Sequence, residues 1–168
     1  MKVFGKYARL NDADQRLRLA LLDWGVTHGG EIPTDQALSI AQSIADTHPI
    51  EWKGRTPAEV LDDIEAQRYF RRSEDKGICY LYPYSAYPTD YQVTLADGRQ
   101  FYAMCAIDAM GSAVTFHQPI EIRSKCRDTK EEIYLRLTPE EGLVEIVPDD
   151  NIIATYYDTM THYIAFNC

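Results

Sequence analysis

Two residues near the middle of the chain, Cys105 and Asp108, are the side chains best suited to joint chemistry. The apolar residues around them predict a helix that begins around Phe101 and ends at Gly111, because glycine commonly stops a helix. Residues three positions apart lie on one face of a helix. A thiolate there would bind a soft metal, and a neighbouring carboxylic acid would carry a proton. We therefore expect Cys105 and Asp108 to act on a common atom.

This chemistry places opposite requirements on the two side chains. The thiol needs a pKa lowered from its usual value, which an early position in a helix favours. Asp108 needs a pKa above the usual value of about 3.9, so that it can take the thiol proton and later release it. Burial among Ala103, Ile107 and Ala109 would cause that shift.

The spacing of the four cysteines predicts thiols rather than disulfides or a zinc site, because no CxxC pair is present. Cys79 lies in an apolar segment and is predicted to be core. Cys126, between Lys125 and Arg127, either has a pKa lowered by these cations or is a structural thiol, and we favour the structural role. His117 and His162 have no partner at ligand spacing, so neither is expected to bind a metal.

An aromatic and hydroxyl-rich segment lies upstream of these residues. Its tyrosines either line a pocket or pack a small sheet, and Ser85 is a further candidate within it. The tyrosines concerned are Tyr80, Tyr82, Tyr84 and Tyr87.

The composition is that of a soluble globular protein, with 45% hydrophobic and 26% charged residues. No apolar run approaches the roughly 20 residues of a membrane span, and the first residues lack the apolar stretch of a secretory signal. We therefore expect a cytoplasmic protein without a membrane partner. The net charge of −9 opposes nucleic-acid binding, which relies on Lys and Arg neutralising phosphates. A small-molecule substrate is expected instead, and homodimer formation is left open.

Helical spacing of apolar residues predicts three helices in the first half of the chain. The first covers residues 12–24 and is stopped by Gly29 and Gly30. The second covers residues 34–47, with Thr34 as its N-cap.

The third helix is predicted by Thr56, Pro57 and Glu59, which form a capping-box pattern with proline at the first helical position. Three helices followed by a strand have the outline of a winged-helix module. The third helix is acidic, so a structural or oligomerisation role is favoured over DNA binding. Its acidic residues are Glu59, Asp62, Asp63 and Glu65, and its predicted buried face is Val60, Leu61, Ile64 and Tyr69.

Short β-rich segments dominate the second half, so the predicted fold class is α+β with a small mixed sheet. Turns are predicted at residues 96–98 and 138–142. A charged linker at residues 71–77 is expected to divide a helical lobe, residues 1–75, from a catalytic domain, residues 76–168. The predicted strands are 78–82, 91–95, 120–123, 133–137, 143–147 and 152–157.

The run Tyr102-Ala103-Met104-Cys105-Ala106-Ile107-Asp108 resembles the Tyr-Ala-x-Cys-Ala-x-Asp signature of the organomercurial lyase (alkylmercury lyase) family. Residues 83–89, followed by Gln92-Val93, are similar to the family's Pro-Phe-Ser-x-x-Pro-Thr stretch. Ser124-Lys125-Cys126 resembles its Ser-x-Cys element. The resemblance covers most of the chain, and the segment around Cys105 is its specific part.

The family uses a second cysteine near the C-terminal end of its fold. An ungapped placement brings Cys168, preceded by Phe166 and Asn167, to that position. A gapped alternative sets Thr161-His162 on the family's Cys-His pair and leaves Met160 in place of the thiolate. We prefer the ungapped placement, in which Cys168 is the last residue of the chain.

The resemblance implies a winged-helix-like lobe followed by a small mixed sheet that carries a short helix. It also implies protonolytic cleavage of carbon–mercury bonds by Cys105, Asp108 and Cys168, all three acting at the metal. No added cofactor is implied; Hg(II) is the bound product, and external thiols remove it. Two alternatives stay open: a soft-metal (mercury or copper) binding or sensing protein that uses Cys105 with Cys126 or Cys168, and a relative recruited to a different lyase or biosynthetic reaction.

Overall fold

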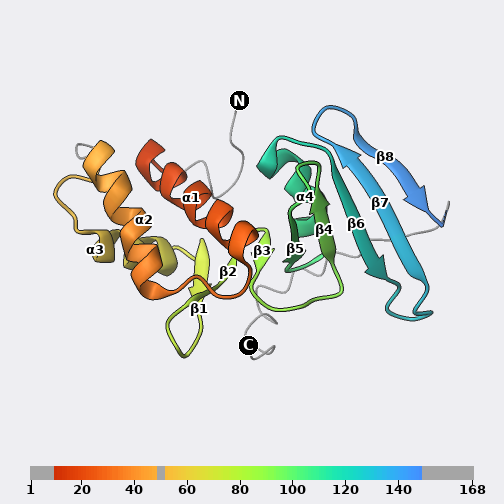
Figure 1. The fold of residues 1–168 in the computed structure, drawn as a ribbon, viewed down its shortest axis with the longest axis horizontal. Coiled ribbons are helices and arrows are strands. Elements are labelled where there is room, and N and C mark those ends of the chain that lie inside the picture. Colours follow the sequence, from red (N-terminus) through yellow and green to blue (C-terminus); the bar gives the residue numbers. More distant parts are fainter. Residues whose placement is uncertain (1–9, 49–51, 149–168) are drawn as a thin grey trace. The chain divides into compact units, whose positions relative to one another are not determined.

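The computed structural model describes residues 10–48 and 52–148, which form helices and short antiparallel strands (Figure 1). The chain divides into two compact units, residues 1–87 and 88–168. The α+β class is therefore confirmed for the described residues. The predicted strand at residues 152–157 lies outside them.

The first unit contains three helices, α1 (Asp12–His28), α2 (Thr34–Thr47) and α3 (Pro57–Ala66). The end of α1 follows the prediction, because Gly29 takes a φ of 72° that few other residues adopt. The capping box of α3 is also confirmed: the Thr56 side chain accepts from the Glu59 N–H, and the Glu59 carboxylate accepts from the Thr56 N–H. The predicted buried face of α3 is confirmed as well.

The start of α2 differs from the prediction. Thr34 is the first helical residue rather than the N-cap, a position that Pro33 occupies without a side-chain hydrogen bond. The Thr34 hydroxyl instead donates to the carbonyl of Lys76 at 2.9 Å. A bond to a residue so distant in sequence is not readable from a local capping pattern.

Three strands complete the first unit: β1 (Phe70–Arg72), β2 (Ile78–Leu81) and β3 (Tyr84–Ser85). Residues 71–77, expected as a linker, instead form part of the β1–β2 hairpin. Arg71 pairs with Tyr80, and the Ser73 N–H donates to the Gly77 carbonyl. The charged residues of this segment therefore belong to a hairpin rather than to a linker.

The second unit is built on five strands in the order β5-β4-β6-β7-β8. Its strand pairs are antiparallel, where a mixed sheet was expected, because short turns join β4 to β5, β6 to β7 and β7 to β8. The predicted turns are confirmed, with Gly98 at φ 88° and Gly142 at φ 75°. The strands are β4 (Gln92–Leu95), β5 (Gln100–Ala103), β6 (Ile120–Lys125), β7 (Glu132–Thr138) and β8 (Gly142–Val147).

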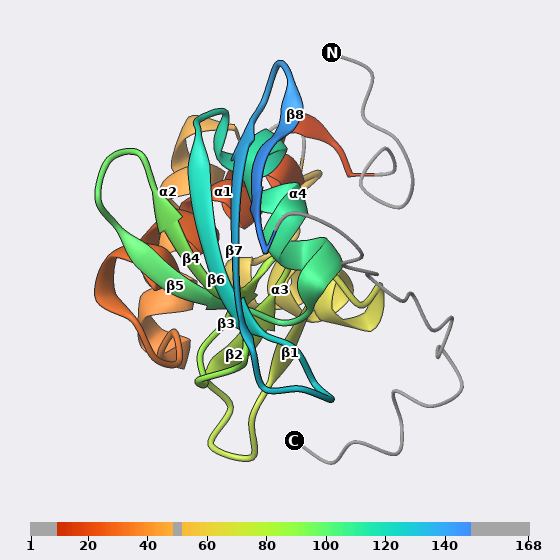
Figure 2. The same cartoon turned by 90° about the vertical axis from the view of Figure 1, so that its right-hand side faces the viewer.

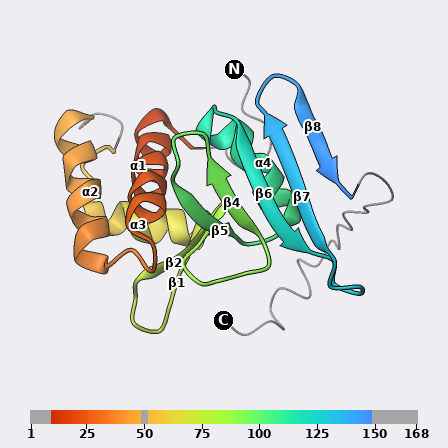
Figure 3. The ribbon, with the colours of Figure 1, turned by 45° about the vertical axis from the view of Figure 1, so that its right-hand side comes forward.

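A single described helix of this unit, α4 (Ala106–Phe116), connects β5 to β6 and covers one face of the sheet (Figures 2 and 3). Phe101 on β5 contacts Phe116 at the end of α4, with ring centroids 5.5 Å apart. Alternate strand residues point toward the helix and are buried, as a half-covered sheet requires. They include Val93, Leu95, Phe101, Ala103, Ile120 and Ile122.

The predicted helix over residues 101–111 is wrong at both ends. Its first three residues belong to β5, where Phe101 pairs with Val93 and Tyr102 with Gln92. The helix continues past Gly111 and ends at His117, which takes the left-handed conformation. A short apolar run fits a strand as well as a helix, and here the partner strand decides.

No helix among the described residues is long and apolar enough to cross a membrane.

Ala109 sets the distance between α4 and the sheet, because its side chain is fully buried. We expect Ala109→Leu to overfill this interface and lower the free energy of unfolding by about 1–3 kcal/mol. Urea unfolding followed by circular dichroism measures this loss. The matched control is Val114→Leu on the same helix, 53% exposed, where we expect a change within about 0.5 kcal/mol. Equal effects of the two substitutions would contradict the packing argument.

Candidate functional site

The thiol of Cys105 lies at the junction between a strand and a helix. β5 ends at Ala103, and Cys105 is the N-cap of α4, with extended φ and ψ of −156° and 175°. Its sulfur accepts a hydrogen bond from the N–H of Asp108 at 3.4 Å. Its carbonyl accepts the first intrahelical bond, from Ala109 at 2.9 Å. A sulfur therefore occupies the place where a serine or aspartate oxygen commonly caps a helix.

Asp108 lies in the first turn of α4 and is buried, with 7% of its surface exposed. The expected burial is thus observed: Ala103 and Ala109 are fully buried, whereas Ile107 points outward and is 39% exposed. Ser112, one turn later, donates its hydroxyl to the Asp108 carbonyl at 2.9 Å. Sequence reasoning missed Ser112, because a serine inside a helix carries no distinctive pattern.

The pKa of the Cys105 thiol is raised to about 11, chiefly because burial disfavours the charged sulfur. The negative charge of Asp108 and a hydrogen bond between the thiol and its carboxylate raise the pKa further. The backbone N–H groups of Asp108 and Ile107 act in the opposite direction but are outweighed. The expectation of a lowered thiol pKa is therefore wrong for this structure, because the helix N-terminus does not overcome burial and a like charge.

A thiol with this pKa keeps its proton at neutral pH. The thiolate fraction is therefore small, and an electrophile that reacts only with the thiolate reacts slowly. A soft metal ion can displace the proton as it binds sulfur, and a hydrogen-bonded carboxylate is placed to receive it. The pair thus supplies a sulfur ligand and a proton acceptor at one point.

Cys126 is a half-buried thiol in the turn that follows β6. Its pKa is lowered, with the largest effect from hydrogen bonding to Thr129 and a further one from the Asp128 N–H. The Thr129 N–H lies 3.5 Å from the sulfur. The sequence left open a pKa lowered by Lys125 and Arg127 and favoured a structural thiol; the pKa is lowered, but by hydrogen bonds rather than by these cations.

The other candidate residues do not join Cys105 in the described part of the structure. Cys79 is 1% exposed, so its predicted core position is confirmed. His117 is the residue at which α4 ends. Cys168 and His162 lie outside the described residues. Within residues 10–48 and 52–148, no cluster of three or more His, Cys, Asp or Glu side chains is arranged to hold a metal ion.

The tyrosine-rich segment is at least partly structural. Tyr84 is buried and donates its hydroxyl to the Gly30 carbonyl, and burial raises its pKa to about 12. The Tyr80 and Tyr87 rings meet edge to face at 5.8 Å. Ser85 is 2% exposed and bonds to the backbone of Tyr87. Packing and hydrogen bonds to the backbone account for Tyr84 and Ser85.

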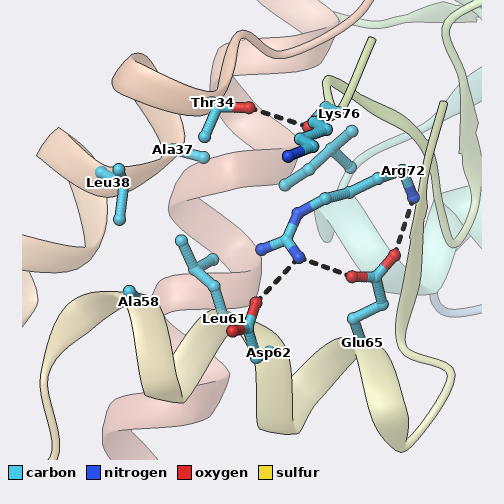
Figure 4. A pocket seen from close by; sticks show the side chains of 10 residues that line it. Thr34, Ala37, Leu38, Ala58, Leu61, Asp62, Glu65, Arg72 and Lys76 are labelled. Carbon is cyan, nitrogen blue, oxygen red and sulfur yellow. Dashed lines mark hydrogen bonds and ion pairs between the residues drawn. The ribbon is translucent and has the colours of Figure 1, made fainter. Parts of the chain in front are cut away.

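The first unit contains a pocket of about 440 Å³ between α2, α3 and the β1–β2 hairpin (Figure 4). Its walls include Ala37, Leu61 and Ile78. At its rim Arg72 forms ion pairs with Asp62 at 2.9 Å and Glu65 at 2.6 Å. No cysteine lines the pocket, so it offers nothing to the chemistry expected of Cys105.

The turn at Cys105 places a half-buried thiol next to a buried carboxyl group. Residues 84–165 match the model of the alkylmercury lyase family. The resemblance carried by the run from Tyr102 to Asp108 is thereby confirmed. No match is found among curated proteins.

Among solved structures, the chain is similar to the one described as the mercury-bound form of MerB2. The two chains are 22% identical and align with a TM-score of 0.58. The alignment covers 86% of this chain and 64% of the other, so this chain spans a little under two thirds of its relative. At this identity the similarity establishes the fold.

The contrast between Cys105 and Cys126, the two half-buried thiols of the described residues, is measurable. We expect the alkylation rate of Cys105 by iodoacetamide to rise about tenfold per pH unit from pH 7 to 10 without levelling, because its thiolate forms only near pH 11. The rate at Cys126 should level off at a lower pH, because its pKa is lowered. Mass spectrometry of the modified peptides separates the two sites.

The variant Asp108→Asn provides the control for this measurement. Removal of the negative charge should lower the pKa of Cys105 and raise its alkylation rate at a given pH, while the rate at Cys126 stays the same. A Cys105 profile that levels off below pH 9 in the unmodified chain would show that burial does not control this thiol.

Proposed function

We propose that the protein cleaves carbon–mercury bonds by protonolysis, with Cys105, Asp108 and Cys168 as its reactive residues. The observation that carries the proposal is the pair at the N-terminus of α4, where a protonated thiol is hydrogen-bonded to a buried carboxylate. The match of residues 84–165 to the alkylmercury lyase family model supports it.

The first step is capture of the substrate R–Hg–X by Cys105. The sulfur–mercury bond forms, the group X leaves with its electron pair, and the thiol proton passes to the Asp108 carboxylate. Sulfur is the ligand that a soft metal selects. Burial of Asp108 keeps the transferred proton from exchanging readily with water.

The second step needs a second sulfur on mercury, which we assign to Cys168. Two thiolates donate electron density to the metal and weaken its bond to carbon. The electron pair of that bond stays with carbon, which takes the proton from Asp108 and departs as R–H. The second thiol releases its own proton to solvent or to X⁻. Hg(II) is left as the bound product, and external thiols remove it without any added cofactor.

The remaining assignments concern the rest of the chain. We infer that the catalytic function belongs to the second unit, and that the three helices of the first unit form a winged-helix-like lobe with a structural or oligomerisation role. The acidic residues on α3 support this inference over DNA binding, because they would repel phosphate. We propose that the protein encounters its small organometallic substrate in the cytoplasm.

Incubation with phenylmercury and excess free thiol tests the proposal, with benzene in the headspace as the readout. The unmodified chain should release benzene, and Cys105→Ser should release none above the buffer level. Asp108→Asn should lower the rate by about 10²–10⁴, the range for loss of a general acid, while still binding phenylmercury through sulfur. Cys79→Ala is the matched control, because this buried thiol lies in the first unit and should leave the rate unchanged.

The outcomes separate this proposal from its alternatives. Tight mercury uptake that Cys105→Ser abolishes, without benzene release, would identify a soft-metal binding protein. If the protein shows neither mercury uptake nor benzene release, the remaining alternative is a relative with different chemistry. Activity retained by Cys168→Ser would remove that residue from the mechanism and keep the other two.

A further inference from the structure

Two hydrogen bonds join the segment before β4 to the end of β5, two residues from Cys105, and a third lies within the segment. The Thr89 hydroxyl donates to the Ala103 carbonyl at 2.6 Å and accepts from the Tyr91 N–H at 3.1 Å. The Ala103 N–H donates to the Tyr91 carbonyl at 2.9 Å. One threonine side chain thus fixes the position of Tyr91 relative to the strand that leads into the reactive turn.

The strand register places Tyr91 on the face of the sheet that α4 covers. Gln92 pairs with Tyr102 and Val93 with Phe101, so Tyr91 lies opposite Ala103. Side chains alternate along a strand, and Val93, Phe101 and Ala103 are all buried on the α4 side. Tyr91 therefore points to that side at the end of the sheet where α4 begins and where Cys105 lies.

The electrostatic environment of Tyr91 agrees with this position near the thiol. The pKa of Tyr91 is raised, first by burial and then by the charges of Cys105 and Asp90, while Arg127 acts in the opposite direction. Both the Tyr91 side chain and the Cys105 thiol are half-buried.

We propose that Tyr91, held in place by the Thr89 hydroxyl, is a positioning residue that covers the Cys105 sulfur and keeps it out of water. The inference rests on the proposed function in taking Cys105 as the reactive thiol. It adds the residue that limits the access of water and reagents to that thiol. In this role the ring of Tyr91 matters, because excluding water requires bulk rather than a hydroxyl group.

Alkylation of Cys105 by iodoacetamide, without any mercury compound, tests this role directly. Tyr91→Ala should uncover the sulfur and raise the Cys105 rate at pH 8 by about tenfold or more, since the reagent then reaches the thiol without a local opening of the fold. Tyr91→Phe keeps the ring and should stay within about twofold of the unmodified chain. A large effect of Tyr91→Phe would assign the role to the hydroxyl and overturn the proposal.

Thr89 provides an independent pair of variants. Thr89→Val preserves shape but removes both hydrogen bonds of the hydroxyl, so it should accelerate Cys105 alkylation in the same direction as Tyr91→Ala. Thr89→Ser retains the hydroxyl and should restore the rate of the unmodified chain. Equal rates for Thr89→Val and Thr89→Ser would show that the hydroxyl does not fix Tyr91.

Cys126 is the internal reference in every sample, because its thiol lies in the same unit and is already partly hydrated. If Tyr91→Ala accelerates Cys105 and Cys126 equally, the unit has loosened as a whole and the proposal fails. If neither rate changes, Tyr91 does not cover the sulfur. These readouts need no lyase activity, so a chain that releases no benzene would remove the proposed function without deciding whether Tyr91 covers Cys105.

Discussion

The structure of the second unit depends on one short connection, in which a paired strand ends at Ala103 and a helix starts three residues later. Because β5 is bound to β4 by backbone hydrogen bonds and α4 is bound to the sheet by its buried face, the connecting residues have little freedom. Cys105 is fixed at the helix terminus by this constraint. The same constraint fixes the position of Asp108, since the first helical turn brings the Asp108 N–H back to the Cys105 sulfur.

Two physical effects compete at this thiol. The partial positive charge of a helix N-terminus favours a thiolate, and its contribution is often enough to make a cysteine reactive. Here the sulfur is half-buried and faces a carboxyl group that is itself buried, and these effects prevail. The result is a thiol that keeps its proton at neutral pH beside a buried carboxyl group, which suits the proposed transfer of that proton.

Local signals in the sequence predicted the features that local interactions control. The capping box of Thr56 and Glu59 and the glycine turn at Gly98 were correct, because each depends on residues within a few positions. The helix over residues 101–111 was wrong because the partner of Phe101 lies on β4, which the local pattern does not contain. The predicted lowering of the Cys105 pKa was wrong for the same reason, since burial depends on tertiary contacts. The identities of Cys105 and Asp108 came from a motif, whereas the place of Tyr91 follows only from register.

The lowered pKa of Cys126 and the raised pKa of Cys105 also have a consequence for survival in an oxidising environment. Peroxides attack thiolates, and accessible thiols of low pKa are converted first to sulfenic acid. An oxidant would therefore react with the Cys126 thiol before it reacted with the Cys105 thiol. The same proton that makes Cys105 slow to react with iodoacetamide also slows the oxidation of its sulfur by peroxide.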